Sequence, residues 1–252
     1  MIHYYHNTDT LKMGITLRDL TLPDQGNMGI VAPQTRTDVL KNRHIFLKAL
    51  NLTPSHYVQA HQTHSKHCVQ VTQADGGRGF FDPSTAFDQT DALYTLEPDL
   101  LLAIFTADCV PLLFYDEESP LIGAIHSGWR GTVQNITQAT FSTIFDRHPH
   151  LKPDTFHVQL GPSLSPLHFE VDKDVYEQFK GLNEASDCIS YDSTRKKWHI
   201  DNRRVVKNQC LKAGILEENI RLYPLDTYES PYGFSYRENH TPRRHLHFIW
   251  RK

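Results

Sequence analysis

Three short polar segments of the sequence carry the side chains that could do chemistry. Cys109 follows Asp108 in a polar interruption between two apolar runs. His126 begins the stretch HSGWRG, and His64 lies in QTHS. A thiolate and two imidazoles supply three protein ligands for Zn²⁺ and leave a fourth position for water or substrate. Any one of these residues alone is more typical of a structural position, so the hypothesis of a zinc site rests on their conjunction.

The stretch AIHSGWRGT, residues 124–132, is typical of a strand that passes through a glycine-containing turn into a helix. Unpaired N–H groups and the helix dipole favour an anion at such a helix start. Gly128 and Gly131 let the backbone approach a ligand closely, and Arg130 adds a forked donor. We therefore expect phosphate to be held by Arg130 and the N–H groups from Ser127 to Gly131. The same residues are equally compatible with a tight turn whose arginine pairs with a surface carboxylate.

A second histidine cluster, HQTHSKH, spaces His61, His64 and His67 by three residues. On a strand, His64 points away from the other two, and the flanking residues are rich in strand formers. We therefore do not group these three histidines into one site.

Other chemistries remain open for Cys109 and His126. A metal-free cysteine hydrolase would use the thiol as nucleophile and the imidazole as base. Copper also binds imidazole and thiolate, but a multicopper site needs many paired histidines, and the sequence shows the H-x-H pattern only at 148–150 and 245–247. The polar triad itself argues against a non-catalytic binding module.

The elements that must position these residues are a mixture of strands and helices, which predicts an α+β (mixed α/β) fold. Strand signals flank each polar break, and Cys109 and His126 can lie at the same end of a sheet because one strand out and one strand back separate them. Asp172 and Asp201 are suited to N-caps, and Gly214 to a helix stop. The expected strands lie in 57–72, 100–116, 120–126 and 245–250, the expected helices are 38–50, 172–182, 201–214 and one through 133–144, and a long loop covers 73–91.

Composition indicates an ordinary globular protein. The 252 residues are 39% hydrophobic and 22% charged, with a formal net charge of −3, so bulk charge predicts neither a nucleic-acid nor a membrane partner. The four cysteines form no CxxC pair, and the N-terminus has no signal-peptide pattern, which favours free thiols in the cytoplasm. We expect one domain, residues 1–252, without an obligate protein partner.

Several motifs, occurring in order, make the chain resemble the YfiH-type family, whose members are called purine nucleoside phosphorylases and earlier laccase-domain or polyphenol oxidase proteins. The resemblance runs from about residue 57 to the end. Its motifs are QTHS (62–65), TADC (106–109), HSGWRG (126–131), LGPSLSPLHFEV (160–171) and FSYRENHTPRRHLHFIW (234–250).

The resemblance implies one mixed α/β domain with sheets flanked by helices, and zinc held by His64, Cys109 and His126. It implies phosphorolysis of adenosine, inosine and methylthioadenosine, with adenosine deamination alongside, so purine nucleosides and phosphate are the expected partners. Zinc-activated water suits deamination, with Asp108 as the candidate proton carrier.

The family site is also similar in layout to cysteine deamidases, and its members have been linked to editing of cell-wall precursors, which keeps an amide-hydrolase alternative. The chain departs from the family pattern at Ser127, usually Ala, at Asp226, often Cys, and in SLSPLHFEV. These departures concern the substrate preference more than the metal ligands.

Overall fold

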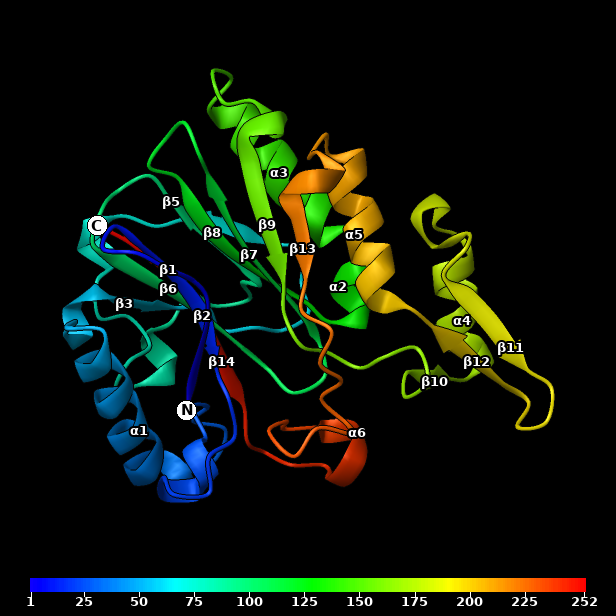
Figure 1. Ribbon diagram of the computed structural model, residues 1–252, viewed down its shortest axis with the longest axis horizontal. Helices are drawn as coiled ribbons and strands as arrows, with labels where there is room; N and C mark the ends of the chain where they lie inside the picture. Colours follow the sequence, from blue (N-terminus) through cyan, green and yellow to red (C-terminus); the bar gives the residue numbers. More distant parts are fainter.

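The computed structural model describes the chain from Met1 to Lys252, apart from the side chain of Pro33. Two mixed sheets pack face to face at its centre (Figure 1). The first sheet has the strand order β1 (Ile2–Asn7), β2 (Leu11–Thr16), β14 (His245–Arg251), β6 (Leu100–Thr106) and β3 (Tyr57–Gln59). The second has the order β13 (Ile220–Leu222), β9 (Phe156–Leu160), β7 (Val110–Asp116), β8 (Ile122–Ser127), β5 (Ala92–Thr95) and β4 (Cys68–Gln70).

Helices cover the outer face of each sheet, which makes four layers (Figure 1). Helix α1 (Arg36–Ala49) packs Phe46 and Leu47 against the first sheet, and helices α3 (Ile136–Arg147) and α5 (Asn202–Lys212) pack against the second. Between the sheets, the core is aliphatic, for example Leu102 against Ala124. Burial on both faces explains why the runs around Cys109 are continuously apolar rather than alternating.

A smaller unit projects from one side of these layers (Figure 1). It contains a three-stranded sheet, with the order β10 (Glu170–Val171), β12 (Lys197–Ile200) and β11 (Ile189–Asp192), and helix α4 (Lys173–Lys180). The two remaining helices are short and lie near the candidate site: α2 (Trp129–Val133) and α6 (Tyr236–Asn239).

The structure confirms the mixed α/β fold and the predicted strands, and it places a loop with two 3₁₀ turns over 73–91. Asp201 caps α5 by accepting the N–H of Arg204, and Gly214 follows this helix with φ +94°. Two expectations were wrong in detail. The helix predicted through 133–144 is divided into α2 and α3, because Asn135 adopts a left-handed conformation with φ 60°. The side chain of Asp172 does not cap α4 and instead pairs with Lys197.

The hairpin of β7 and β8 brings Cys109 and His126 to one end of the second sheet. Its register pairs Val110 with Ser127 and Pro111 with His126. The four cysteines are free thiols, as expected. Among the described helices, none has the length and apolar character needed to cross a bilayer.

Candidate metal centre and the cavity around it

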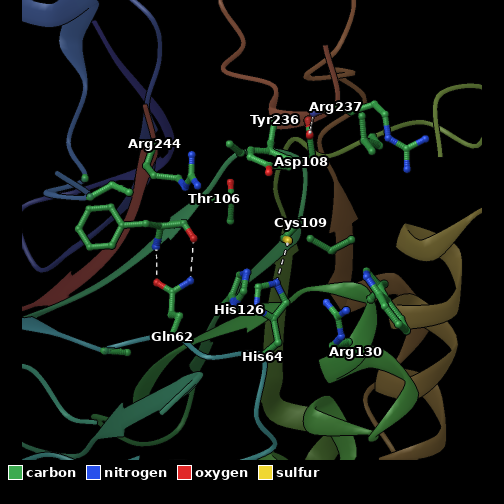
Figure 2. A pocket seen from close by; sticks show the side chains of 18 of the residues that line it. Gln62, His64, Thr106, Asp108, Cys109, His126, Arg130, Tyr236, Arg237 and Arg244 are labelled. Carbon is green, nitrogen blue, oxygen red and sulfur yellow. Dashed lines mark hydrogen bonds between the residues drawn. The ribbon is translucent and has the colours of Figure 1, made fainter. Parts of the chain in front are cut away.

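His64, Cys109 and His126 meet at the edge of the second sheet (Figure 2). Their donor atoms all lie within 4.8 Å of one another, and Cys109 Sγ is 3.7 Å from His64 Nε2. His126 is buried at the end of β8, whereas His64 and Cys109 are half-buried, and all three line a cavity. The structure thus brings together the three side chains that the sequence singles out.

Strained backbone presents two residues of this site to the cavity. His64 has φ 62° in the connection between β3 and β4, and Asp108, just before Cys109, has φ 94° in the β6–β7 turn. Non-glycine residues rarely adopt such angles, and they persist where the surrounding contacts fix them.

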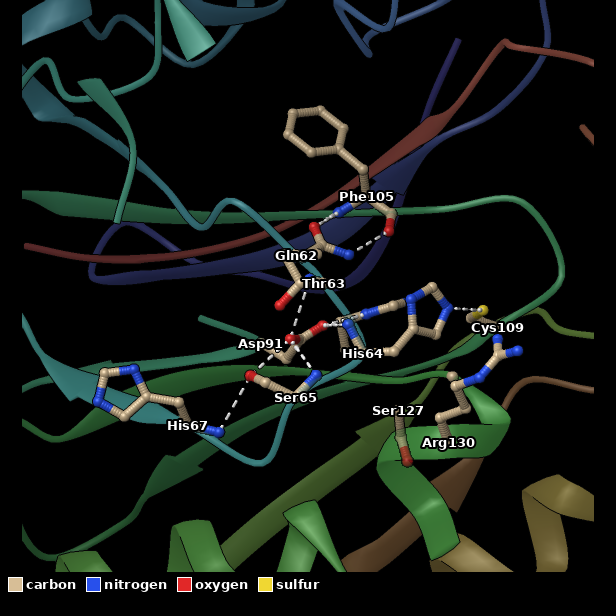
Figure 3. Close-up of polar contacts among 12 residues, drawn as sticks. Gln62, Thr63, His64, Ser65, His67, Asp91, Phe105, Cys109, Ser127 and Arg130 are labelled. Carbon is tan, nitrogen blue, oxygen red and sulfur yellow. Dashed lines mark hydrogen bonds and ion pairs between the residues drawn. The ribbon is translucent and has the colours of Figure 1, made fainter. Parts of the chain in front are cut away.

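The buried carboxylate of Asp91 provides those contacts for His64 (Figure 3). It accepts the backbone N–H groups of Thr63, His64 and Ser65 and the hydroxyl of Ser65. The same carboxylate lies 2.7 Å from Nδ1 of His126. Asp91 therefore orients the imidazole of His126 and fixes the backbone that carries His64. It leaves Nε2 of His126 available to a metal or to the Cys109 sulfur, which is the arrangement typical of metal-bound histidines.

Charge coupling in this cluster favours a thiolate. Burial alone would raise the pKa of Cys109, but the charges and hydrogen bonds of His126 and His64 lower it to about 6. Burial would likewise lower the pKa of His126, but Cys109 and Asp91 raise it to about 9. A thiolate is the form of cysteine that binds metals and acts as a nucleophile.

Gly128 is needed for the close approach of these ligands. A Cβ atom at this position would lie 2.3 Å from Cδ2 of His64 and 3.1 Å from Sγ of Cys109. Ser127 turns its hydroxyl to Thr132, at 2.8 Å, and is fully buried. Helix α2 has only five residues, so its dipole attracts an anion only weakly. These contacts favour the tight-turn interpretation for Ser127, Gly128 and Gly131.

Arg130 differs from its neighbours because its exposed side chain lines the cavity and stacks on Trp129, at 4.3 Å from the ring centroid. No carboxylate of the described residues lies within ion-pair distance of Arg130, so the expected alternative of a surface ion pair is not found there. Arg130 therefore remains a candidate for anion binding.

The cavity has a volume of about 760 Å³, which is within the range of small-molecule sites. Its walls combine aromatic side chains with guanidinium groups, and Arg237 and Arg244 reach it from different segments than Arg130 (Figure 2). The aromatic lining residues are Phe105, Trp129, Phe169 and Tyr236.

Asp108 also lines this cavity. Its Oδ1 accepts the hydroxyl of Thr227 at 2.8 Å, and its Oδ2 accepts the backbone N–H of Arg237 at 2.6 Å. Burial raises the pKa of Asp108, an effect that these hydrogen bonds partly offset. A raised pKa makes this carboxyl group easier to protonate than an aspartate in water.

The donor set fits zinc better than a multicopper cluster. One sulfur and two imidazole nitrogens match the ligands of catalytic zinc sites, which retain an open position. Among the described residues, these three form the only group of metal-ligating side chains that converges. The H-x-H pair at 245–247 is buried: His245 accepts the N–H of Phe234, and His247 contacts Thr106. His61 pairs with Asp88 and does not belong to the ligand group.

Several residues of the site were not predicted from the sequence. The only sequence signal for Asp91 is its position directly before the apolar run ALYTL. Arg237 and Arg244 lie in a segment that is distant along the chain, and nothing in their local pattern places them at the cavity.

Comparisons with known proteins find a family model and several similar sequences. A family model described as "Multi-copper polyphenol oxidoreductase laccase" matches residues 13–252. The chain is 31% identical over 205 residues to purine nucleoside phosphorylase YlmD of Bacillus subtilis, covering 81% of this chain and 73% of the relative. It is 33% identical over 248 residues to purine nucleoside phosphorylase SSP1584 of Staphylococcus saprophyticus, covering 95% of this chain and 91% of the relative.

Solved structures show the same fold. The hypothetical protein YfiH of Bacillus licheniformis superposes with a TM-score of 0.89 at 25% identity, over 99% of both chains. YlmD of Geobacillus stearothermophilus superposes with a TM-score of 0.89 at 28% identity, over 97% of this chain and 93% of that one.

Proposed function

This chain belongs to the multi-copper polyphenol oxidoreductase laccase family, and from that premise we propose that it is a zinc-dependent purine nucleoside phosphorylase. Its proposed substrates are adenosine, inosine and methylthioadenosine, with phosphate as the second reactant, and it deaminates adenosine as a side activity. The observation that carries the proposal is one cavity that combines the His64, Cys109 and His126 ligand set, an unpaired Arg130 and aromatic walls.

Each part of the cavity suits one part of the reaction. The aromatic walls suit a flat purine, and the guanidinium of Arg130 suits an oxyanion because its planar fork matches phosphate. In phosphorolysis, a phosphate oxygen bonds to C1′ of the ribose while the C1′–N9 bond breaks and its electron pair leaves with the purine. Asp108, whose pKa is raised by burial, is the proposed donor of the proton that neutralises the departing base.

Zinc would be held by Nε2 of both histidines and by the thiolate of Cys109. When bound, it supplies a Lewis acid next to the substrate. Asp91 fixes the orientation of His126 and of the loop that carries His64, so the ligands need no reorganisation when the metal binds.

A second candidate function is favoured by one observation. Cys109, His126 and Asp91 are arranged as thiol, imidazole and carboxylate, because Nδ1 of His126 lies 2.7 Å from Asp91 and the donor atoms of His126 and Cys109 lie within 4.8 Å of each other. This order is that of a cysteine hydrolase, whose nucleophile is activated by a base that a third group orients. An amide hydrolase acting without metal is the corresponding alternative.

Chelation and alkylation separate the two functions. If Cys109 is a zinc ligand, removal of zinc by a chelator abolishes turnover, and readdition of zinc restores it, while bound zinc protects the thiol from iodoacetamide. If Cys109 is a nucleophile, alkylation inactivates the protein completely and chelation has no effect. Nucleoside phosphorolysis that survives complete metal removal would exclude the zinc-dependent function.

A further inference from the structure

The first residue of α5, Asn202, carries a buried amide whose oxygen has no hydrogen-bond partner. The residue is 7% exposed, its Oδ1 receives no donor from the described residues, and it lines the cavity. An unpaired polar group inside a protein lowers the free energy of unfolding, and native structures contain few such groups. A group of this kind facing a cavity is accounted for by a ligand that pairs with it.

The residues on either side of Asn202 hold the start of α5 in place. Asp201 accepts the N–H of Arg204, which fixes the first turn of α5. The guanidinium of Arg203 donates to the hydroxyl and carbonyl oxygens of Ser163 and to the carbonyl oxygen of Tyr223. The backbone that carries the amide is therefore fixed before any ligand arrives.

Apolar and aromatic side chains surround this part of the cavity. The N–H of Ile200 donates to the carbonyl oxygen of Phe169, which ties the start of α5 to the segment that supplies Leu164 and Phe169. Both side chains belong to the same apolar cluster as Trp129 and line the cavity with it. Such walls suit a flat heterocycle, whereas ribose hydroxyls or phosphate would lack partners on them.

We propose that Asn202 recognises the base edge of the purine nucleoside, an inference that rests on the proposed function. The amide offers one donor and one acceptor side by side. Adenine presents its 6-amino donor beside the N1 acceptor, and hypoxanthine presents the mirror pattern, the O6 acceptor beside the N1–H donor. Rotation of the amide by half a turn serves either base, so one residue accepts both adenosine and inosine while rejecting purines without a 6-substituent.

The test pairs a substitution with a deletion from the substrate. Asn202→Leu replaces the amide by an apolar group of the same branched shape, and purine riboside lacks the 6-amino group of adenosine. In the zinc-loaded wild type, the ratio of kcat/KM for adenosine to that for purine riboside contains the contribution of the amide. In Asn202→Leu, that ratio should fall about tenfold, as expected for one lost hydrogen bond of the stronger kind. The exposed Asn183→Leu serves as the control, whose ratio should equal that of the wild type.

The thermal midpoint of the ligand-free protein separates recognition from a structural role. If the amide awaits a ligand, Asn202→Leu keeps or raises the midpoint, because an unpaired polar group is removed from apolar surroundings. An unchanged substrate ratio in Asn202→Leu, whatever its thermal midpoint, would overturn the inference while leaving the phosphorylase function intact. A wild type that neither binds nor cleaves adenosine or inosine would overturn the proposed function and this inference with it.

Discussion

The substitution Gly128→Ala tests how tightly the candidate ligands are packed. The added Cβ would lie 2.3 Å from Cδ2 and 2.7 Å from Nε2 of His64. Two carbon atoms normally stay about 3.5–4.0 Å apart, so the imidazole must move by roughly 1.2–1.7 Å. A zinc–nitrogen bond tolerates a deviation of only about 0.2 Å, so a displacement of this size removes His64 from the coordination sphere.

We therefore expect Gly128→Ala to lose zinc affinity by at least about 100-fold, because removal even of an outer hydrogen-bond partner costs about 10- to 100-fold. The free energy of unfolding of the metal-free protein should fall by only about 1–2 kcal/mol, since His64 can swing into the cavity and relieve the overlap. The variant is thus a folded protein with a damaged metal site.

Gly131→Ala is the matched control. Its Cβ would lie 3.4 Å from Cγ2 of Ile136, which is an ordinary contact. The position is helical, so alanine should leave zinc affinity unchanged and stabilise the fold by up to about 1 kcal/mol. Zinc affinity is measured by competition with a chromophoric chelator and stability by urea unfolding. Equal zinc affinity for Gly128→Ala and wild type would refute the reasoning about ligand packing.

Three further predictions concern Arg130, Asp91 and Cys109. Arg130→Ala should raise the KM for phosphate by roughly 30- to 150-fold, the equivalent of about 2–3 kcal/mol, and should spare adenosine deamination. Arg130→Lys should recover part of the loss, and steady-state kinetics that show an unchanged phosphate KM for Arg130→Ala would make this residue structural. Asp91→Asn should lower zinc affinity by about 10- to 100-fold in the chelator competition, because the imidazole of His126 and the backbone that carries His64 lose a charged partner; unchanged affinity would exclude a positioning role. The rate at which iodoacetamide alkylates Cys109 in the metal-free protein, followed by mass spectrometry, should be constant above the thiol pKa of about 6. It should fall as the pH drops below that value, because protonation removes the thiolate. A rate that still rises tenfold between pH 7 and 8 would contradict the lowered pKa.

The sequence predicted the metal-ligand cluster because each ligand is marked by its own neighbours, as a polar residue that interrupts strand-forming runs. Cys109 interrupts apolar runs that become β6 and β7, and the chain length to His126 allows only a short hairpin. The same pattern of polar breaks located His64. The roles of these three residues as metal ligands remain predictions.

Contacts between distant segments could not be predicted in this way. The strands β1 and β2 are joined to β6 only through β14 at the other end of the chain, and short, half-polar sequences such as IHYYHN give little strand signal alone. Asp91 and Asn202 gain their significance from burial against residues far along the chain, which no spacing rule reports. Gly128 was interpreted as a ligand-binding glycine, whereas its proximity to His64 depends on a loop 64 residues earlier.

Formation of ribose 1-phosphate from adenosine or inosine and inorganic phosphate tests the central claim most directly. Phosphorus NMR of the zinc-loaded protein should show ribose 1-phosphate accumulating in step with the free base, and no such signal should form with Cys109→Ala or after removal of zinc. Release of free ribose without ribose 1-phosphate, or equal yields with and without zinc, would contradict a zinc-dependent phosphorylase.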